Sequence, residues 1–469
     1  MKIGDFMYVA SKKQMQKIDE ILLKTYTIEE LVDKASDCLL EEVNNYDSYL
    51  IVCGSGNNGA DGYSLALKLR ELGKIVTVVA SNTTKMSQAC KYYYEKCKYL
   101  IRDVDEVCLF DYDVVIDGLF GFGLHSNPKG IYASLIEWMN LHKNIISIDV
   151  PSGLHCDTGE VYENCIHANK TITFFASKLG FNSDDAKKVI GEVIIKRLDV
   201  IDISNQIELP IYYDAIQIKK RKHDGHKYHY GKSFLICGSN DYHGAALLST
   251  KASVYTGCGL TCLYSIKDIL NEASIYVPEA IHTTNLEKLN TYSSILIGCG
   301  LDSNEELLIK ILKETTQSLV IDASSLNDLS KHLDLLNQDR PIILTPHLGE
   351  FKRLCPDCDD PTISAIEFAK KYNVTLVLKG ANTLITNGKV SVRNTTGNGG
   401  MAIGGCGDVL AGMIVSLLAQ GYSSFDACKN AVYLHGLIGD ELYKEEYSVL
   451  PSKIIDLIPK YMKKMSSVD

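Results

Sequence analysis

The first half of the chain alternates short apolar runs with longer amphipathic segments. Segments 61–72 and 84–98 have the spacing of amphipathic helices. Strands that alternate with helices are typical of a parallel sheet covered on both faces. The first half therefore predicts an α/β domain with a Rossmann-like, doubly wound sheet. The runs of strand length, each close to a glycine or an aspartate, are residues 50–53, 75–80, 114–116, 145–150 and 171–175.

The second half repeats this alternation after a polar, basic segment at residues 219–226. We place the domain boundary near residue 212, which gives domains 1–211 and 212–469. A hairpin with Asn387 and Gly388 in a tight turn is expected near the end. This order of elements predicts a ribokinase-like α/β layer domain. The expected strands are 234–237, 260–264, 295–297, 319–321, 342–344 and 375–378, and the expected helices are 244–256, 405–419 and 424–443.

Length and composition narrow the class of protein. A chain of 469 residues is longer than one hydrophobic core usually serves, so two domains are expected. The formal charge of −10 comes from 48 basic and 58 acidic residues without a long basic run, so a nucleic-acid partner is not expected. The most apolar stretch, 409–419, is too short to span a membrane. Fifteen scattered cysteines favour reduced thiols and a cytoplasmic protein over a disulfide framework.

Three strand ends in the first half carry candidate chemistry. GSGNNGADG (54–62) leads into a helix, where free N–H groups attract a phosphate. Asp117 and Asp149 follow two further strands, at the edge where an open α/β sheet binds ligands. Oxygen atoms of Asn58, Asp117 and Ser152 could converge on a hard cation, which leaves Asp149 as acid or base. The alternative is a set of connecting turns without a ligand.

The strongest motif is GNGGMAIGGCGD (397–408), which precedes an apolar helix. Its backbone N–H groups and the helix dipole can stabilise a phosphoryl group, and Asp408 can accept a proton from an attacking hydroxyl. A packed turn, with Asp408 as a helix-end charge, is the alternative. Lys379 follows a buried strand and could hold a nucleotide. For His347, also after a strand, a structural role is the alternative.

The motifs GSGNNGADG, DGLFGFG and IDVPSG, in this order, resemble the NAD(P)H-hydrate epimerase domain over about residues 1–210. The resemblance implies that the first domain interconverts the R and S epimers of a hydrated nicotinamide cofactor. It implies potassium held by Asn58, Asp117 and Ser152, and Asp149 at the epimerised centre. The implied substrate contacts are Asn57, Asn58, Gly59, Ala60, Asp61, Gly121, Phe122, Gly123, Leu124, His125, Ser126, Asn127 and Asp149.

The second domain resembles the ADP-dependent NAD(P)H-hydrate dehydratases over residues 212 to about 465, through GSNDYHGA, IGCG, LTPHLGEF, LKGANT and the glycine run. In that family ADP, with Mg²⁺, phosphorylates the S hydrate; loss of phosphate restores the cofactor and leaves AMP. The resemblance implies Asp408 as base and hydrate contacts at Ala245, Gly300, His347 and Asp408. The implied nucleotide contacts are Lys379, Gly380, Ala381, Asn382, Thr383, Asn398, Gly399, Gly400, Met401, Ala402, Ile403, Gly404, Gly405, Cys406 and Gly407.

Both motif sets depart from the family patterns at a few positions. Ala60 replaces a glycine of NGGDG, Cys299 and Asp302 alter GPGLG, and Ser324 alters DADAL. An alternative function is a small-molecule kinase of the ribokinase type with a non-catalytic nucleotide-binding N-terminal module. The expected partners are NADH hydrate, NADPH hydrate and ADP, and homo-oligomers are expected by analogy.

Because the two motif sets lie in separate predicted domains, residues 212–469 alone should dehydrate the S hydrate with ADP and leave the R hydrate largely unconsumed. The full-length chain should consume both epimers. Absorbance of the reduced nicotinamide follows the reaction. Equal rates on both epimers by the isolated C-terminal half would contradict this division of labour.

Overall fold

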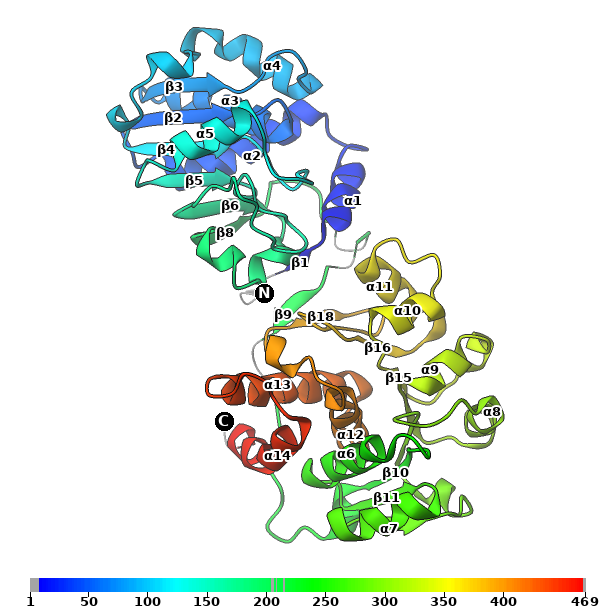
Figure 1. The fold of residues 1–469 in the computed structure, drawn as a ribbon. Coiled ribbons are helices and arrows are strands. Elements are labelled where there is room, and N and C mark those ends of the chain that lie inside the picture. Colours follow the sequence, from blue (N-terminus) through cyan, green and yellow to red (C-terminus); the bar gives the residue numbers. More distant parts are fainter. Residues whose placement is uncertain (1–7, 204–205, 208, 214–215, 467–469) are drawn as a thin grey trace. The chain divides into compact units, whose positions relative to one another are not determined.

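The computed structural model describes residues 8–203, 206–207, 209–213 and 216–466. The sequence predicts a boundary near residue 212; the chain divides into two compact units between Leu209 and Pro210. Each unit is built on its own mostly parallel sheet (Figure 1).

The N-terminal unit has a six-stranded parallel sheet in the order β3-β2-β4-β5-β6-β8. Side chains of α2, α3 and α4 pack with alternate residues of β2, and α5 packs with the residues between them, so the helices cover opposite faces. The expected doubly wound sheet is therefore confirmed. The strands are β2 (Ser48–Cys53), β3 (Ile75–Ala80), β4 (Val114–Gly118), β5 (Ile145–Ile148), β6 (Lys170–Phe174) and β8 (Glu192–Lys196), and the helices are α2 (Ile28–Val43), α3 (Asn57–Glu71), α4 (Gln88–Cys97) and α5 (Ile131–Met139).

An N-terminal segment that the sequence patterns did not predict completes this unit. Strand β1 (Val9–Ala10) pairs in parallel with β7 (Ser177–Lys178), apart from the main sheet. Helix α1 (Lys12–Leu22) follows and begins with a capping box, in which Ser11 and Gln14 each bond to the other's backbone N–H. Its apolar face packs on Ala176 and on the start of α2. This docking holds α1 against the main body of the unit.

The C-terminal unit has a ten-stranded sheet in the order β12-β11-β10-β13-β14-β15-β16-β17-β18-β9. It is parallel from β12 to β16, and β17 pairs antiparallel with β16 and β18. The strands are β9 (Ile211–Tyr213), β10 (Lys232–Ile236), β11 (Leu260–Tyr264), β12 (Ile281–Thr283), β13 (Ser294–Ile297), β14 (Ser318–Ile321), β15 (Ile342–Leu344), β16 (Thr375–Leu378), β17 (Leu384–Thr386) and β18 (Ser391–Asn394).

Two helical layers cover this sheet and define two apolar clusters. Helices of the first layer surround the apolar α12, and the second layer packs on the opposite face. The first layer is α6 (His243–Tyr255), α7 (Lys267–Tyr276), α12 (Cys406–Ala419), α13 (Ser424–Tyr443) and α14 (Pro451–Met465). The second is α8 (Glu305–Glu314), α9 (Ser324–Leu329), α10 (Leu348–Leu354) and α11 (Pro361–Tyr372).

Two local expectations differ from the structure. The hairpin turn is shifted by one residue: Asn387 N donates to Val390 O at 3.3 Å, so Gly388 and Lys389 form its tip, and Gly388 supplies the positive φ of 77°. Helix α3 starts at Asn57, so most of the glycine-rich segment 54–62 is helical rather than a loop. Gly59 allows this early start, because a Cβ there would lie 2.0 Å from Gly54 O.

Among the described residues, no helix combines the length and apolar character needed to cross a membrane. All fifteen cysteines are unpaired thiols.

Helix α12 packs closely on α6 at Gly412, so a substitution there tests how much this packing contributes to stability. A Cβ at Gly412 would lie 2.2 Å from Ser249 O, whereas a Cβ at Gly404, just before the same helix, would meet nothing within 4 Å. Gly412→Ala should lower the free energy of unfolding of the C-terminal unit by about 1–3 kcal/mol through overpacking. Gly404→Ala is the matched control and should leave it unchanged. Calorimetry that finds equal melting temperatures for both variants would contradict the packing argument.

Candidate active sites

A cavity of about 620 Å³ opens at the carboxyl ends of the N-terminal strands. It is lined by Asn57, Asn58 and Asp61 of α3, by residues 121–126 after β4, and by Asp149 after β5. The structure thus brings the three strand-end motifs together. Helix α1 adds Asp19 to the wall, a residue that sequence reasoning missed because α1 lies outside the glycine-rich motifs.

Three of the expected contact residues do not line this cavity. Gly59 and Ala60 are buried on the inner side of α3. Ala60 is not among the described residues with positive φ, and its methyl group is part of the core, so the departure from NGGDG is accommodated. Asn127 accepts a hydrogen bond from Asn164 N at 3.1 Å and holds the neighbouring loop instead.

Asp117 and Ser152 form a buried polar network beneath the cavity. Ser152 Oγ donates to Asp117 Oδ1 at 2.6 Å, and Ser147 Oγ donates to Asp117 Oδ2 at 2.8 Å. The N–H groups of Ser152 and Leu119 donate to the same carboxyl group. Burial raises the pKa of Asp117, and these hydrogen bonds oppose that rise.

The neighbourhood of Asp117 contains oxygen atoms that could hold a hard cation. Ser152 Oγ also lies 3.5 Å from Phe120 O, so its proton can turn away from Asp117 and free a carboxyl oxygen. Asn58 Nδ2 is buried and has no hydrogen-bond partner among the described residues. A half-turn of the Asn58 amide would place Oδ1 at the position of Nδ2, where that oxygen could bind a cation. Among the described residues, no group of three or more His, Cys, Asp or Glu forms a transition-metal site.

Asp149 is held by a buried lysine that the sequence motifs did not reveal. Lys178 Nζ lies 2.8 Å from Asp149 Oδ1, and both side chains are buried. Asp149 Oδ2 accepts from Phe122 N at 3.1 Å, and Thr173 Oγ1 donates to Oδ1 at 3.0 Å. Asp149 has a φ of 63°, an uncommon conformation for a residue other than glycine, and such conformations occur frequently at functional sites.

The C-terminal glycine run forms the start of α12. Gly405 is the N-cap residue with a φ of 99°, and Asp408 stands in the first helical turn. Cβ atoms built at Gly399 and Gly404 would meet nothing within 4 Å, so these backbone positions are open to a ligand. A Cβ at Gly407 would lie 3.5 Å from Lys379 Nζ, which places that ammonium group beside the helix N-terminus.

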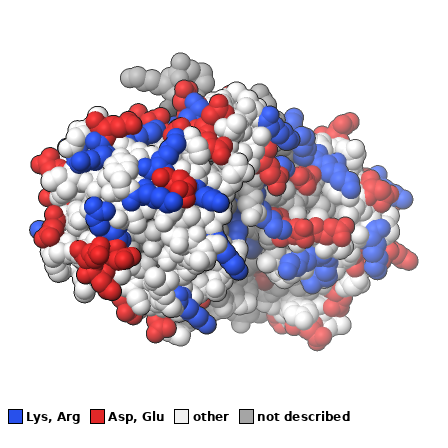
Figure 2. All heavy atoms as spheres, turned by 90° about the horizontal axis from the view of Figure 1, so that it is seen from above, with Lys and Arg blue, Asp and Glu red and all other residues white. Residues whose placement is uncertain are grey.

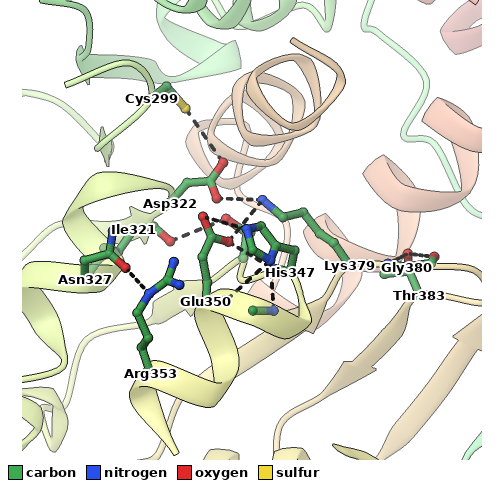
Figure 3. Close-up of polar contacts among 12 residues, drawn as sticks. Cys299, Ile321, Asp322, Asn327, His347, Glu350, Arg353, Lys379, Gly380 and Thr383 are labelled. Atoms are coloured by element: carbon green, nitrogen blue, oxygen red, sulfur yellow. Dashed lines mark hydrogen bonds and ion pairs between the residues drawn. The ribbon is translucent and has the colours of Figure 1, made fainter. Parts of the chain in front are cut away.

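Lys379 connects this helix start to two acidic residues (Figure 3). Its Nζ lies 2.8 Å from Asp322 Oδ1 and 3.9 Å from Glu350 Oε2. Cys299 Sγ donates to the other carboxyl oxygen of Asp322, at 3.9 Å. Burial lowers the pKa of Lys379, but the two carboxylates outweigh burial and leave it above its ordinary value. Burial, followed by the charge of Asp322, raises the pKa of Asp408 to about 6.

Asp322 and Glu350 are site residues that sequence reasoning missed. Asp322 directly follows β14, and Glu350 lies in the first turn of α10. The signal that identified Asp117 and Asp149, an acid at a strand end, also applies to Asp322.

Other expected contacts have structural partners. His347 caps α10: its Nδ1 accepts from Gly349 N at 2.9 Å, while Glu350 Oε2 accepts from His347 N at 2.8 Å. Asn398 Nδ2 donates to Asp440 Oδ1 at 2.8 Å, so this side chain braces the glycine run on α13. Within the segment 379–383, Thr383 Oγ1 donates to Gly380 O at 2.9 Å.

The other C-terminal residues that the sequence analysis singled out lie around or near the loop that follows β13. A Cβ at Gly300 would lie 2.6 Å from Ala245 Cβ, so these two expected hydrate contacts are adjacent. Ser324 Oγ donates to Gly298 O at 3.1 Å, which ties the altered DADAL and GPGLG motifs together. Asp302 is exposed.

On the face drawn in Figure 2, basic and acidic side chains are interspersed. Mixed charge of this kind does not create the positive field with which proteins attract polyanions.

Comparisons with known proteins cover both units. Residues 24–180 match a family model described as YjeF-related protein N-terminus, and residues 233–460 match one described as NAD(P)H-hydrate dehydratase. Two proteins named bifunctional NAD(P)H-hydrate repair enzyme are similar over nearly the full length. The one from Dictyoglomus turgidum is 31% identical over 97% of this chain and 98% of its own. The one from Coxiella burnetii is 32% identical over 92% and 94%.

A solved structure supports the C-terminal fold. A ribokinase-like superfamily protein from Enterococcus faecalis aligns with a TM-score of 0.51 and 32% identity, over 55% of this chain and 99% of its own. The expected ribokinase-like architecture is therefore confirmed.

Proposed function

This chain belongs to the family of bifunctional NAD(P)H-hydrate repair enzymes, and we propose that its two units repair hydrated NADH and NADPH in sequence. The N-terminal unit would interconvert the R and S hydrates, and the C-terminal unit would dehydrate the S hydrate at the expense of ADP, giving AMP and phosphate. The observation that carries this proposal is one candidate acid site in each unit: Asp149 in the N-terminal cavity and Asp408 at the start of α12.

In the N-terminal cavity, we assign substrate binding to Asn57, Asn58, Asp61, residues 121–126 and Asp149, because these line one cavity. Potassium would be held by oxygen atoms of Asn58, Asp117 and Ser152 and would supply positive charge beside the substrate. Asp149 would act on the epimerised centre, with its carboxylate held in place by the ion pair to Lys178.

In the C-terminal unit, the glycine run and segment 379–383 would bind ADP, and Ala245, Gly300, His347 and Asp408 would contact the hydrate. Asp408 would take the proton from the hydroxyl that is phosphorylated. The open N–H groups at the start of α12 and the ammonium group of Lys379 would stabilise charge on the transferred phosphoryl group. Magnesium would neutralise the phosphates of ADP.

The alternative, a small-molecule kinase with a non-catalytic N-terminal module, is not favoured. The similarity to bifunctional repair enzymes extends over both units. The N-terminal cavity is also lined by polar side chains that could bind a substrate, among them Asn57, Asn58 and Asp149. For the cellular compartment we propose the cytoplasm, since fifteen unpaired thiols suit reducing conditions. The expected homo-oligomer stays a prediction.

Replacing Asp408 should separate binding from chemistry. Asp408→Asn keeps the shape of the side chain but cannot accept the proton, so the dehydration rate should fall by about 10²- to 10⁴-fold. Nucleotide affinity should change far less. In the wild-type protein the dehydration rate should decline as the pH falls through about 6, because Asp408 is then protonated and no longer a base.

Epimerisation by the same full-length variant is the internal control, because Asp149 lies in the other unit. The assignment of Asp408 as base is wrong if Asp408→Asn dehydrates the S hydrate at nearly the wild-type rate.

Asp117→Asn tests the potassium site. This change keeps the side-chain volume in a buried network, whereas alanine would leave Ser147 and Ser152 without their acceptor. Epimerisation should fall by about 10- to 100-fold, the usual loss when support for a metal site is removed. The potassium concentration for half-maximal rate should rise, and dehydration should be spared. An unchanged rate with unchanged potassium dependence would remove the cation assignment.

A further inference from the structure

Three carboxyl groups gather in the N-terminal cavity. Asp19, Asp61 and Asp149 line it, and among the described lining residues the other titratable side chain is His125, whose ring lies 2.9 Å from Lys12 Nζ. Lys178, directly behind the wall, forms its ion pair with Asp149. Neither Asp19 nor Asp61 has an ion pair with a described residue. Carboxylates that share a cavity disfavour one another's ionisation, since like charges repel.

The fold places Asp19 in the cavity through a dedicated segment. Strand β1 pairs with β7, the strand that contributes Lys178, and α1 follows β1 with its capping box. Met15, Ile18 and Leu22 of α1 pack into an apolar cluster with Ala176. Met15 and Leu23 line the cavity on either side of Asp19. The same pairing thus positions the lysine that serves Asp149 and the helix that carries Asp19.

We propose that Asp19 is the proton donor for epimerisation, a catalytic role that rests on the proposed function of the N-terminal unit. Asp149 is unsuited to this role because its Oδ1 forms an ion pair with Lys178 Nζ and accepts a hydrogen bond from Thr173 Oγ1. Asp149 and Asp19 would therefore have different tasks, the first as a carboxylate and the second as a carboxylic acid.

The pKa shifts of the cavity acids fit a proton-donating role for Asp19. Burial, then the charge of Asp149, raises the pKa of Asp19 to about 7, with Lys178 opposing the rise. Burial, then the charges of Asp149 and Asp19, raises the pKa of Asp61 well above its ordinary value. Asp19 can therefore release and regain a proton near neutral pH.

The reaction needs such an acid. Hydration of a dihydronicotinamide puts the hydroxyl group on the carbon bonded to the ring nitrogen. Asp19 donates its proton to the hydroxyl oxygen as the C–O bond breaks, and the nitrogen lone pair forms a C=N bond. Water, a cationic ring and the Asp19 carboxylate result. Water then adds to the opposite face of that carbon, and the proton that it releases returns to Asp19 through solvent, so nothing is consumed. Asp149 stabilises the cationic ring as a carboxylate.

The test compares full-length Asp19→Asn, Asp19→Glu and Glu20→Gln. Consumption of the R hydrate is measured with ADP, so that each S hydrate formed is dehydrated. Asp19→Asn should lower kcat for R consumption by about 10²-fold with little change in KM. Asp19→Glu should restore part of the kcat that Asp19→Asn loses. Glu20→Gln removes a charge from an exposed position next to Asp19 and should have the wild-type rate.

The pH profile distinguishes an acid from a structural residue. Wild-type R consumption should decline as the pH rises through about 7, where Asp19 loses its proton, and the residual rate of Asp19→Asn should lack this decline. A near wild-type rate and an unchanged pH profile for Asp19→Asn would overturn the proposal. If Asp19→Asn does not fold, a wild-type profile without the decline would overturn it too. A wild-type protein that dehydrates S but never consumes R would instead refute the epimerase function itself.

Discussion

A parallel strand that is buried on both faces can place a charged side chain only where the strand ends. Both sheets of this chain obey that constraint. The central strands β2 and β4 have fully buried apolar side chains, and polar groups appear at or just after their carboxyl ends. Asp117, Asp149 and Asp322 all occupy such positions. Lys178 and Lys379 pair with two of these charges.

Each unit stabilises one strand-end aspartate with a lysine at 2.8 Å: Lys178 serves Asp149, and Lys379 serves Asp322. In each case a further aspartate nearby lacks the direct ion pair, and its pKa is raised to about 7 for Asp19 and about 6 for Asp408. An acid paired with a lysine, beside a second acid that can exchange its proton, is a physical basis for acid–base chemistry at neutral pH. The same division occurs on two different sheets.

Glycine serves packing at some positions of the two sites and leaves the backbone open at others. In the N-terminal unit, Gly59 lets α3 begin close to β2, because the backbone of Gly54 occupies the space of a Cβ. In the C-terminal unit, Gly399 and Gly404 have free space instead, so their lack of a side chain keeps backbone N–H groups accessible. Each motif also holds the other kind of glycine, since Gly56 is open in the first and Gly405 is packed against Leu248 in the second.

The sequence by itself determined the sheet class of both units, the strand ends with Asp117 and Asp149, and the glycine run before Asp408, because periodicity and glycine spacing are local properties. It did not reveal Asp19, Lys178 or Glu350 as parts of the sites, and it placed the start of α3 too late. Lys178 meets Asp149 only through β6 and the turn into β7, and Asp19 reaches the cavity only because β1 pairs with β7. Contacts between residues far apart in the chain depend on strand pairing and burial. Only the tertiary structure decides which charges share a cavity, and therefore which acid keeps its proton.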